Sequence, residues 1–169
     1  ASATLHGCRV HGSKRAGLFA GGFADLLAQW CDCYDCGYAG VEGSEQAEIR
    51  LDRCIIHHGH RGGVLGLGSS RLLINDCRLT HNSMANLTLR GAATAHTSRT
   101  LLSDSKASGA YVLEAGFLEL HDCIFARNRL LQIESAWCIE LPEIGERSGR
   151  PTSAILVGGS DAHKSRYNR

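Results

Sequence analysis

Acidic and imidazole side chains recur in this sequence at intervals of 23 residues. The row consists of Asp35, His58, His81 and Asp104. Carboxylates and imidazoles at close quarters can transfer protons in general acid–base catalysis, and they can also bind a metal ion or a polar ligand. If the fold places residues 23 apart next to each other, this row is a candidate site of a carbohydrate-active enzyme or a glycan-binding protein. The competing interpretation is a solvated row on the outside of a turn.

A second row with the same spacing carries residue types that dominate protein interfaces. It reads Trp30, Arg53, Asp76, Arg99 and Asp122, so that charge alternates along it. Opposite charges on neighbouring strands help to fix strand register, although an exposed pair contributes only about 0–1 kcal/mol. Tryptophan and arginine are enriched at interface hot spots. We therefore expect a protein or peptide partner to bind along this row.

A third candidate surface consists of apolar residues on alternate repeats. These residues are Phe19, Leu65 and Tyr111. Polar residues occupy the same position in the repeats between them. Isolated apolar residues are normal on protein surfaces, so this set is the weaker indication of a partner.

Cysteines mark the same period. Five of the eight cysteines lie at multiples of 23 residues from one another, and Thr100 takes the one missing step. These five are Cys8, Cys31, Cys54, Cys77 and Cys123. Buried free cysteine behaves as a small apolar side chain, so we expect this row to point into the core. Thiols that stay reduced are typical of a reducing compartment, which predicts a cytoplasmic protein.

The cluster of Cys31, Cys33 and Cys36 raises the alternative of a zinc site. Three histidines follow one repeat later, and zinc binds four thiolate or imidazole ligands in tetrahedral geometry. Two of the three cysteines, however, share their position in the repeat with aliphatic residues. We therefore expect neither a metal nor a cofactor, and a zinc-bound module is the third hypothesis.

Short apolar alternations position these rows. Within one repeat, Ile49 and Leu51, then Ile56, then Val64 mark three segments in which apolar and polar residues alternate. Period-two alternation over so few residues predicts half-buried strands, whereas a helix needs apolar spacings of three and four over a longer stretch. Strands that stack in register form a parallel β-helix. The sequence therefore predicts an all-β fold, a single-stranded parallel β-helix (a solenoid) of about seven coils with 23 residues each.

Two kinds of residue are expected to shape the turns. Gly17, Gly40 and Gly63 precede the third strand of their coils. Glycine tolerates a positive φ, so we expect the chain to turn a corner there. Asn82 and Asn128 are expected to face inward and to hydrogen-bond the neighbouring backbone as an asparagine ladder.

The chain is predicted to be one domain. Residues 1–138 are expected to form the regular coils, and residues 139–169 a degenerate last coil with a C-terminal cap and tail. A coil starts almost at Ala1 without a cap before it, which predicts end-to-end contact through an uncapped N-terminal coil and a larger parent protein. The net charge of +1 does not favour a nucleic-acid partner. No apolar run approaches the ~18 residues that a membrane span needs, so no membrane partner is expected.

The repeats resemble those of a known fold family. The stretches LHGCRVHGSKRAGLFAGG, LDRCIIHHGHRGGVLGLG and INDCRLTHNSMANLTLRG have a form close to C-x-[IVL]-x-x-[NG]-x-x-x-G-[VL]. This form is similar to the right-handed β-helix repeats of carbohydrate-binding proteins and sugar hydrolases. It most closely resembles F-box-only β-helix proteins, which select substrates for ubiquitin ligases, and Shc SH2-domain-binding proteins. The resemblance covers residues 4–135 and implies a right-handed coil.

The hydrolases of this superfamily carry catalytic motifs that can be tested here. Of the polygalacturonase-like motifs, only His58-Gly59-His60 occurs, and Asn-Thr-Asp, Asp-Asp and Arg-Ile-Lys do not. Glycoside hydrolysis also needs two carboxylic acids that flank one bond. We therefore expect a non-catalytic protein-binding or scaffold module of a larger intracellular protein. A carbohydrate-active enzyme or glycan-binding β-helix is the alternative.

Overall fold

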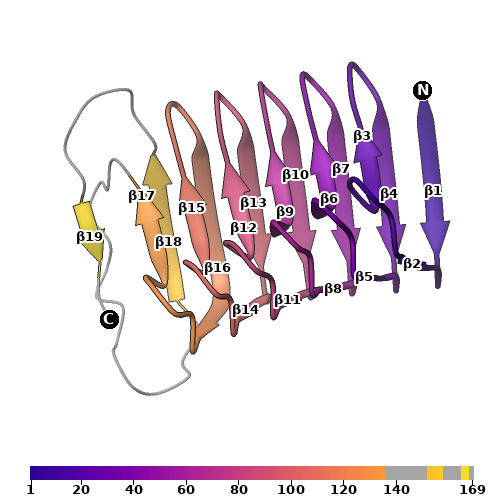
Figure 1. Ribbon diagram of the computed structural model, residues 1–169. Coiled ribbons are helices and arrows are strands. Elements are labelled where there is room, and N and C mark those ends of the chain that lie inside the picture. The colour runs from indigo at the N-terminus through magenta and orange to yellow at the C-terminus, as the bar shows by residue number, and fades with distance from the viewer. Residues whose placement is uncertain (136–151, 158–164, 168–169) are drawn as a thin grey trace.

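The computed structural model describes residues 1–135, 152–157 and 165–167, and these residues form a parallel β-solenoid (Figure 1). The coils follow one another along a single axis, with strand β1 (Ser2–His6) at one end and β17 (Ile133–Ser135) near the other. All regular elements of the described residues are strands. Within those residues, no helix has the length and apolar character needed to cross a membrane. The predicted all-β solenoid is therefore confirmed.

Each coil contributes one strand to each of three parallel sheets, named A, B and C here. Sheet A contains β1, β4 (Asp25–Gln29), β7 (Glu48–Asp52), β10 (Arg71–Asn75), β13 (Thr94–Ser98) and the first half of β16 (Phe117–Ala126). Sheet B contains β2 (Arg9–His11), β5 (Asp32–Tyr34), β8 (Ile55–His57), β11 (Arg78–Thr80), β14 (Leu101–Ser103) and the second half of β16. Sheet C contains β3 (Leu18–Ala20), β6 (Ala39–Gly43), β9 (Gly62–Gly66), β12 (Leu87–Leu89), β15 (Ala110–Val112) and β17. Six parallel coils are thus described, where about seven were predicted.

Neighbouring strands pair with a register of 23 residues. In sheet A, Leu26 pairs with Ile49, which in turn pairs with Leu72. In sheet B, Cys33 pairs with Ile56. Because side chains alternate between the two faces of a strand, a slip by one residue would expose the apolar row. The apolar pattern therefore specifies the register, and the predicted period is confirmed.

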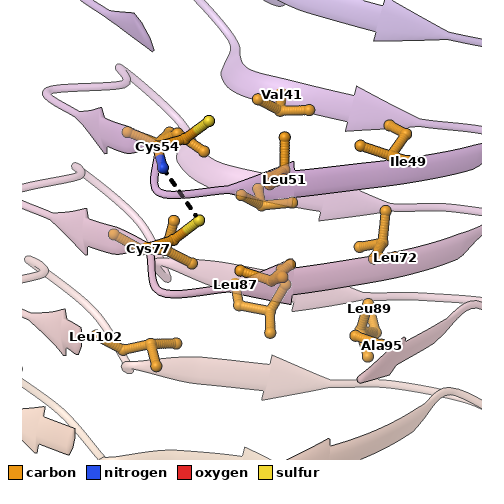
Figure 2. Packing of buried hydrophobic residues seen from close by; sticks show 14 of the residues in the cluster. Val41, Ile49, Leu51, Cys54, Leu72, Cys77, Leu87, Leu89, Ala95 and Leu102 are labelled. Carbon is orange, nitrogen blue, oxygen red and sulfur yellow. Dashed lines mark hydrogen bonds between the residues drawn. The ribbon is translucent and has the colours of Figure 1, made fainter. Parts of the chain in front are cut away.

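The core is a stack of aliphatic side chains inside the coils (Figure 2). Ile49, Leu51 and Leu72 are among the side chains that are fully buried. Burying one such side chain contributes roughly 1.5–3 kcal/mol. Figure 2 shows Cys54 and Cys77 at the edge of this stack, joined by a hydrogen bond from the backbone N–H of Cys54 to Sγ of Cys77 at 3.4 Å. Both cysteines are buried, as the sequence predicted.

Single residues in the left-handed region form the corners of each coil. The row from Trp30 to Asp122 lies between sheets A and B, with φ from 46° to 56°. The row from Asp35 to Arg127 follows sheet B, with φ from 50° to 56°. A left-handed backbone costs a residue other than glycine roughly 1–2 kcal/mol. Both rows singled out from the sequence are therefore corner rows, and their side chains are exposed or half-buried.

The glycines before sheet C do not adopt a left-handed conformation, and that prediction was wrong. Gly17, Gly40 and Gly63 are absent from the positive-φ residues of the chain. A Cβ atom at Gly17 would lie 2.5 Å from Sγ of Cys33 and 2.7 Å from the carbonyl oxygen of Gly40. Glycine occurs there because two coils and a core side chain approach too closely for any Cβ.

Strands β18 (Thr152–Val157) and β19 (Ser165–Tyr167) run against the direction of the coils. β18 pairs antiparallel with β16, and β19 pairs antiparallel with β17. The rest of the predicted last coil, cap and tail (139–169) lies outside the described residues. At the other end, β1, β2 and β3 each pair with a described strand on one side only. End-to-end contact through that coil stays a prediction.

Candidate functional site

A groove of about 620 Å³ lies on the outer surface of the turn that follows sheet B. It contains the whole predicted acid–imidazole row together with three residues that were not predicted. Its lining residues are Asp35, His58, His60, His81, Ser83, Asp104 and Lys106. They come from four successive coils, which span roughly 14 Å at the usual strand spacing. The fold thus gathers the row into one hollow.

The local backbone explains why the lining residues come in pairs. In each turn, the left-handed corner residue points outward, the next residue points inward and the third points outward again. His81 and Ser83, for example, both line the groove and flank the buried Asn82. His60, Ser83 and Lys106 were not predicted because only the corner row was considered. Their signal in the sequence is a spacing of two from that row.

Buried asparagines hold these turns in place. Oδ1 of Asn82 accepts a hydrogen bond from the backbone N–H of Gly59 at 2.9 Å. Oδ1 of Asn128 accepts one from the backbone N–H of Ser105 at 3.1 Å. Asn86 links the two, because it accepts a hydrogen bond from Nδ2 of Asn82 at 2.8 Å and donates one to Asn128 at 3.2 Å. The predicted inward asparagine ladder is confirmed, and a buried network whose members are bonded rigidifies its surroundings.

Stacked rings border the groove on the side of sheet B. His58 and His81 stack with ring centroids 5.3 Å apart and planes 12° apart. His57 meets His58 edge-on and stacks on Tyr34 at 5.2 Å. Nε2 of His57 lies within hydrogen-bond distance of Oδ1 of Asp32, at 3.0 Å. These contacts fix the orientation of the rings along one wall.

Asp104 is held in an ion pair at the edge of the groove. Nε and Nη2 of Arg127 donate hydrogen bonds to its two carboxylate oxygens, each at 2.7 Å. These hydrogen bonds hold the pKa of Asp104 at about 2. Its carboxyl is therefore ionised at neutral pH and has no proton to give. Asp35, the other acid of the groove, forms no ion pair with a described residue.

Trp30 and Arg53 begin the predicted protein-binding row. The Arg53 guanidinium lies 4.9 Å from the centroid of the Trp30 ring, in a cation–π contact. The Trp30 side chain is still 55% exposed. Further along the row, Arg99 donates hydrogen bonds to both carboxylate oxygens of Asp76, at 2.8 and 3.1 Å. The structure therefore divides the row into a cation–π pair and an ion pair.

A polar row that was not predicted runs beside this corner, at the last position of the sheet A strands. Nε2 of Gln29 donates to Asp52 at 3.4 Å, and Nδ2 of Asn75 donates to the other carboxylate oxygen at 3.2 Å. Oγ of Ser98 then donates to Oδ1 of Asn75 at 2.7 Å. The signal in the sequence is a polar residue directly before the corner in four successive coils.

The apolar set of Phe19, Leu65 and Tyr111 lies on sheet C, away from the strands that flank Trp30. Phe19 is 62% exposed, whereas Leu65 and Tyr111 are half-buried. Polar residues of the intervening strands separate the three side chains. The two predicted partner-binding sets therefore occupy different sheets.

The cysteine cluster and the histidines lie on opposite sides of the coil wall. Cys31, Cys33 and Cys36 are buried, whereas His58 and His60 line the exposed groove. Burial raises the pKa of Cys31 and of Cys33, which favours the protonated thiol. Among the described residues, no group of three or more histidine, cysteine, aspartate or glutamate side chains is arranged to hold a metal ion.

Known proteins were compared with this chain. A family model described as a right-handed β-helix region matches residues 1–163. The chain belongs to this family. No curated protein and no solved structure matches it. Membership confirms the type of repeat that the sequence resembles, whereas a closer relation of this right-handed β-helix to F-box-only or Shc SH2-domain-binding proteins stays a prediction.

Proposed function

We propose that this β-helix is a non-catalytic protein-binding module of a larger intracellular protein, and that its partner docks at the corner between sheets A and B. The pairing of Trp30 with Arg53 carries the proposal. Both residue types are enriched at interface hot spots. Arg53 fixes the ring of a tryptophan that is already held by a left-handed backbone, and such preorganisation reduces the entropy lost on binding.

The neighbours of this pair supply the rest of an interface. The hydrogen-bonded row of Gln29, Asp52 and Asn75 lies beside it and can form a polar rim. Their side chains are already ordered by contacts with one another, so little further ordering is needed on docking. The resemblance to F-box-only β-helix proteins, which select protein substrates, also supports a protein partner.

The state of Asp104 supports binding rather than catalysis in the groove. A glycoside hydrolase needs one carboxyl group that is protonated and can act as the general acid. Asp104 is ionised because Arg127 holds its pKa at about 2. Asp35 would then be alone in providing both carboxyl functions.

The cysteines support a reducing compartment, and we propose a cytoplasmic location. Their thiols are satisfied by backbone carbonyl groups, as when Sγ of Cys54 donates to the carbonyl of Ala28 at 3.3 Å. Such buried thiols stabilise the core as free cysteines. Growth of the unfolding temperature on removal of reductant would contradict this part of the proposal.

Affinity capture with matched variants tests the protein-binding function. The bait is the wild-type chain, Trp30→Ala, Arg53→Glu, or the control Arg71→Glu on the open face of sheet A. We expect at least one cytosolic protein to be retained by the wild type and the control, and to be lost about tenfold from both corner variants. The proposal fails if all four baits, with matching circular dichroism, retain the same proteins.

Glycan binding in the groove is the second candidate function. The favouring observation is that Asp35, His58, His81 and Asp104 all line one hollow beside stacked rings. Carboxylates and rings are suitable partners for sugar hydroxyls and sugar faces. A glycan array, followed by assays on uronate polymers, tests this candidate. A hit must be weakened by His81→Asn, and an array without hits dismisses it.

A further inference from the structure

We propose that the groove beside sheet B binds a phosphate or sulfate ester, and that it binds this group more tightly as its imidazoles take up protons. The proposal concerns a different corner from the protein-binding function and does not depend on it. Where the ester is carried by a glycan, the proposal rests on the second candidate function and names the group that the glycan must carry.

The groove contains hydrogen-bond donors that nothing else in the described chain uses. The side chains of His60, Ser83 and Lys106 form no hydrogen bond with another described residue, and all three line the hollow. They come from three successive coils at the same position of the turn. An imidazolium, a hydroxyl and an ammonium group can all donate to one oxyanion. Hydrogen bonds between charged partners are roughly twice as strong as neutral ones.

The charge of the groove depends on its histidines. Arg127 compensates the charge of Asp104 through the ion pair, which leaves Asp35 opposed by Lys106 at neutral pH. An imidazole has an ordinary pKa of about 6.5. Below that pH, His58, His60 and His81 each add a positive charge to the hollow. The field that an anion meets therefore changes from nearly neutral to strongly positive.

The groups around the imidazoles do not cancel this change. His81 lies between His58 of the preceding coil and the already paired Asp104 of the following coil. His58 also meets His57, and their Nδ1 atoms are 2.6 Å apart, so only one of the two can carry a proton there. Asp32 is hydrogen-bonded to the far nitrogen of His57. The imidazoles that lack such a contact are therefore expected to gain protons before His58 does.

The arrangement of donors favours a tetrahedral oxyanion over a carboxylate. A phosphate ester presents three strong acceptor oxygens. Donors that arrive from three coils, about 4.8 Å apart along the axis, can each meet a different oxygen. A bound anion also lies between imidazolium groups that otherwise repel each other, so binding and protonation reinforce each other.

Titration with inorganic sulfate tests the proposal. Sulfate keeps its charge over the range of interest, whereas a phosphate ester itself titrates near pH ~6. We expect the dissociation constant, measured by calorimetry at constant ionic strength in chloride, to fall at least tenfold between about pH 7.5 and about pH 5.5. Histidine signals in NMR spectra should titrate at higher pH when sulfate is present. A dissociation constant that is independent of pH overturns the proposal.

Variants separate the groove from general attraction of anions. His81→Asn keeps a residue that tolerates the left-handed corner, and Lys106→Gln removes the fixed charge. Each should weaken sulfate binding about tenfold, which corresponds to one charged hydrogen bond. The controls His121→Asn and Arg71→Gln remove the same charges from sheet A and should leave the affinity unchanged. Equal losses in variants and controls, with equal unfolding temperatures, overturn the proposal.

Small esters identify the source of the anion. A sulfated and a phosphorylated monosaccharide are titrated under the same conditions, next to the neutral sugar. Tighter binding of either ester than of the neutral sugar supports the proposal and names the ester. Binding of the neutral sugar alone, at any pH, overturns it and leaves the glycan candidate standing. Binding of the free ion without either ester also overturns it.

Discussion

Arg127 and Asp104 form a bidentate ion pair across neighbouring coils, with two hydrogen bonds of 2.7 Å. The pair holds the pKa of Asp104 at about 2, below its value of about 3.9 in an unfolded chain. Its contribution to stability is therefore fully present above about pH 4 and is lost as the pH falls towards about 2. Because Arg127→Gln removes the pair, we expect this variant to be less stable at neutral pH, and the difference from wild type to disappear over that acid range.

Urea unfolding at a series of pH values measures this difference. The control Arg129→Gln removes the next basic side chain of the same turn, which has no ion pair with a described residue. A gap between wild type and Arg127→Gln that stays constant down to about pH 2 would show that the pair does not depend on the ionised Asp104.

Cys77→Thr should be tolerated, whereas Cys77→Val should be destabilising. Sγ of Cys77 accepts the N–H of Cys54 and donates to the carbonyl of Asn75. One coil later, Oγ1 of Thr100 accepts the N–H of Cys77 and donates to the carbonyl of Ser98 in the same way. A threonine can therefore replace the cysteine, but a valine leaves the buried N–H of Cys54 without a partner, at a cost of about 1–3 kcal/mol. Equal stability of the two variants in thermal and urea unfolding would falsify this account.

Gly109→Ala should lower the free energy of unfolding more than Gly12→Ala does. A Cβ at Gly109 would lie 2.6 Å from the carbonyl oxygen of Gln132 and 2.6 Å from Cδ1 of Phe125, so the coils must separate locally. We expect a loss of about 1–3 kcal/mol. Gly12 has a φ of 68° and open space around its Cα, so alanine there costs only the backbone term of roughly 1 kcal/mol. The reverse order in urea unfolding would contradict the close-approach explanation.

Trp30→Gly should change binding but hardly change stability. Glycine relieves the left-handed backbone by roughly 1 kcal/mol, and loss of the contact with Arg53 costs about as much. Gly7 already occupies this corner in the first coil, with a φ of 63°. We expect an unfolding free energy within about 1 kcal/mol of wild type together with loss of the captured partner. Trp30→Val, which is β-branched, should be clearly less stable than Trp30→Gly.

The repeat could be predicted because core residues must recur wherever strands stack. Leu26, Ile49 and Leu72 pair directly, so any coil without an apolar residue at that position would leave a hole. The corners were harder to predict. Left-handed positions usually indicate glycine, asparagine or aspartate, but here they also hold Trp30 and His58. The glycines before sheet C were assigned to the wrong cause because the sequence does not show how closely two coils approach.

The candidate site was predicted in part. The acid–imidazole row follows from the period alone, so its four members were found. His60 and Lys106 were missed because their outward direction depends on the inward side chain between them and the corner residue. The bidentate contact of Arg127 with Asp104 was also not predicted, since residues 23 apart can lie side by side without their side chains meeting. Side-chain orientation at a corner requires the backbone geometry.

The left-handed corners have an evolutionary consequence. Their side chains point away from the aliphatic stack, so a point mutation at Trp30 or His81 alters what the molecule recognises without creating a cavity. Duplication of one 23-residue unit would lengthen every corner row by one residue and preserve all the others in line. An insertion of any other length would shift the downstream rows out of alignment. Such a chain can diversify its surface rapidly while its interior changes slowly.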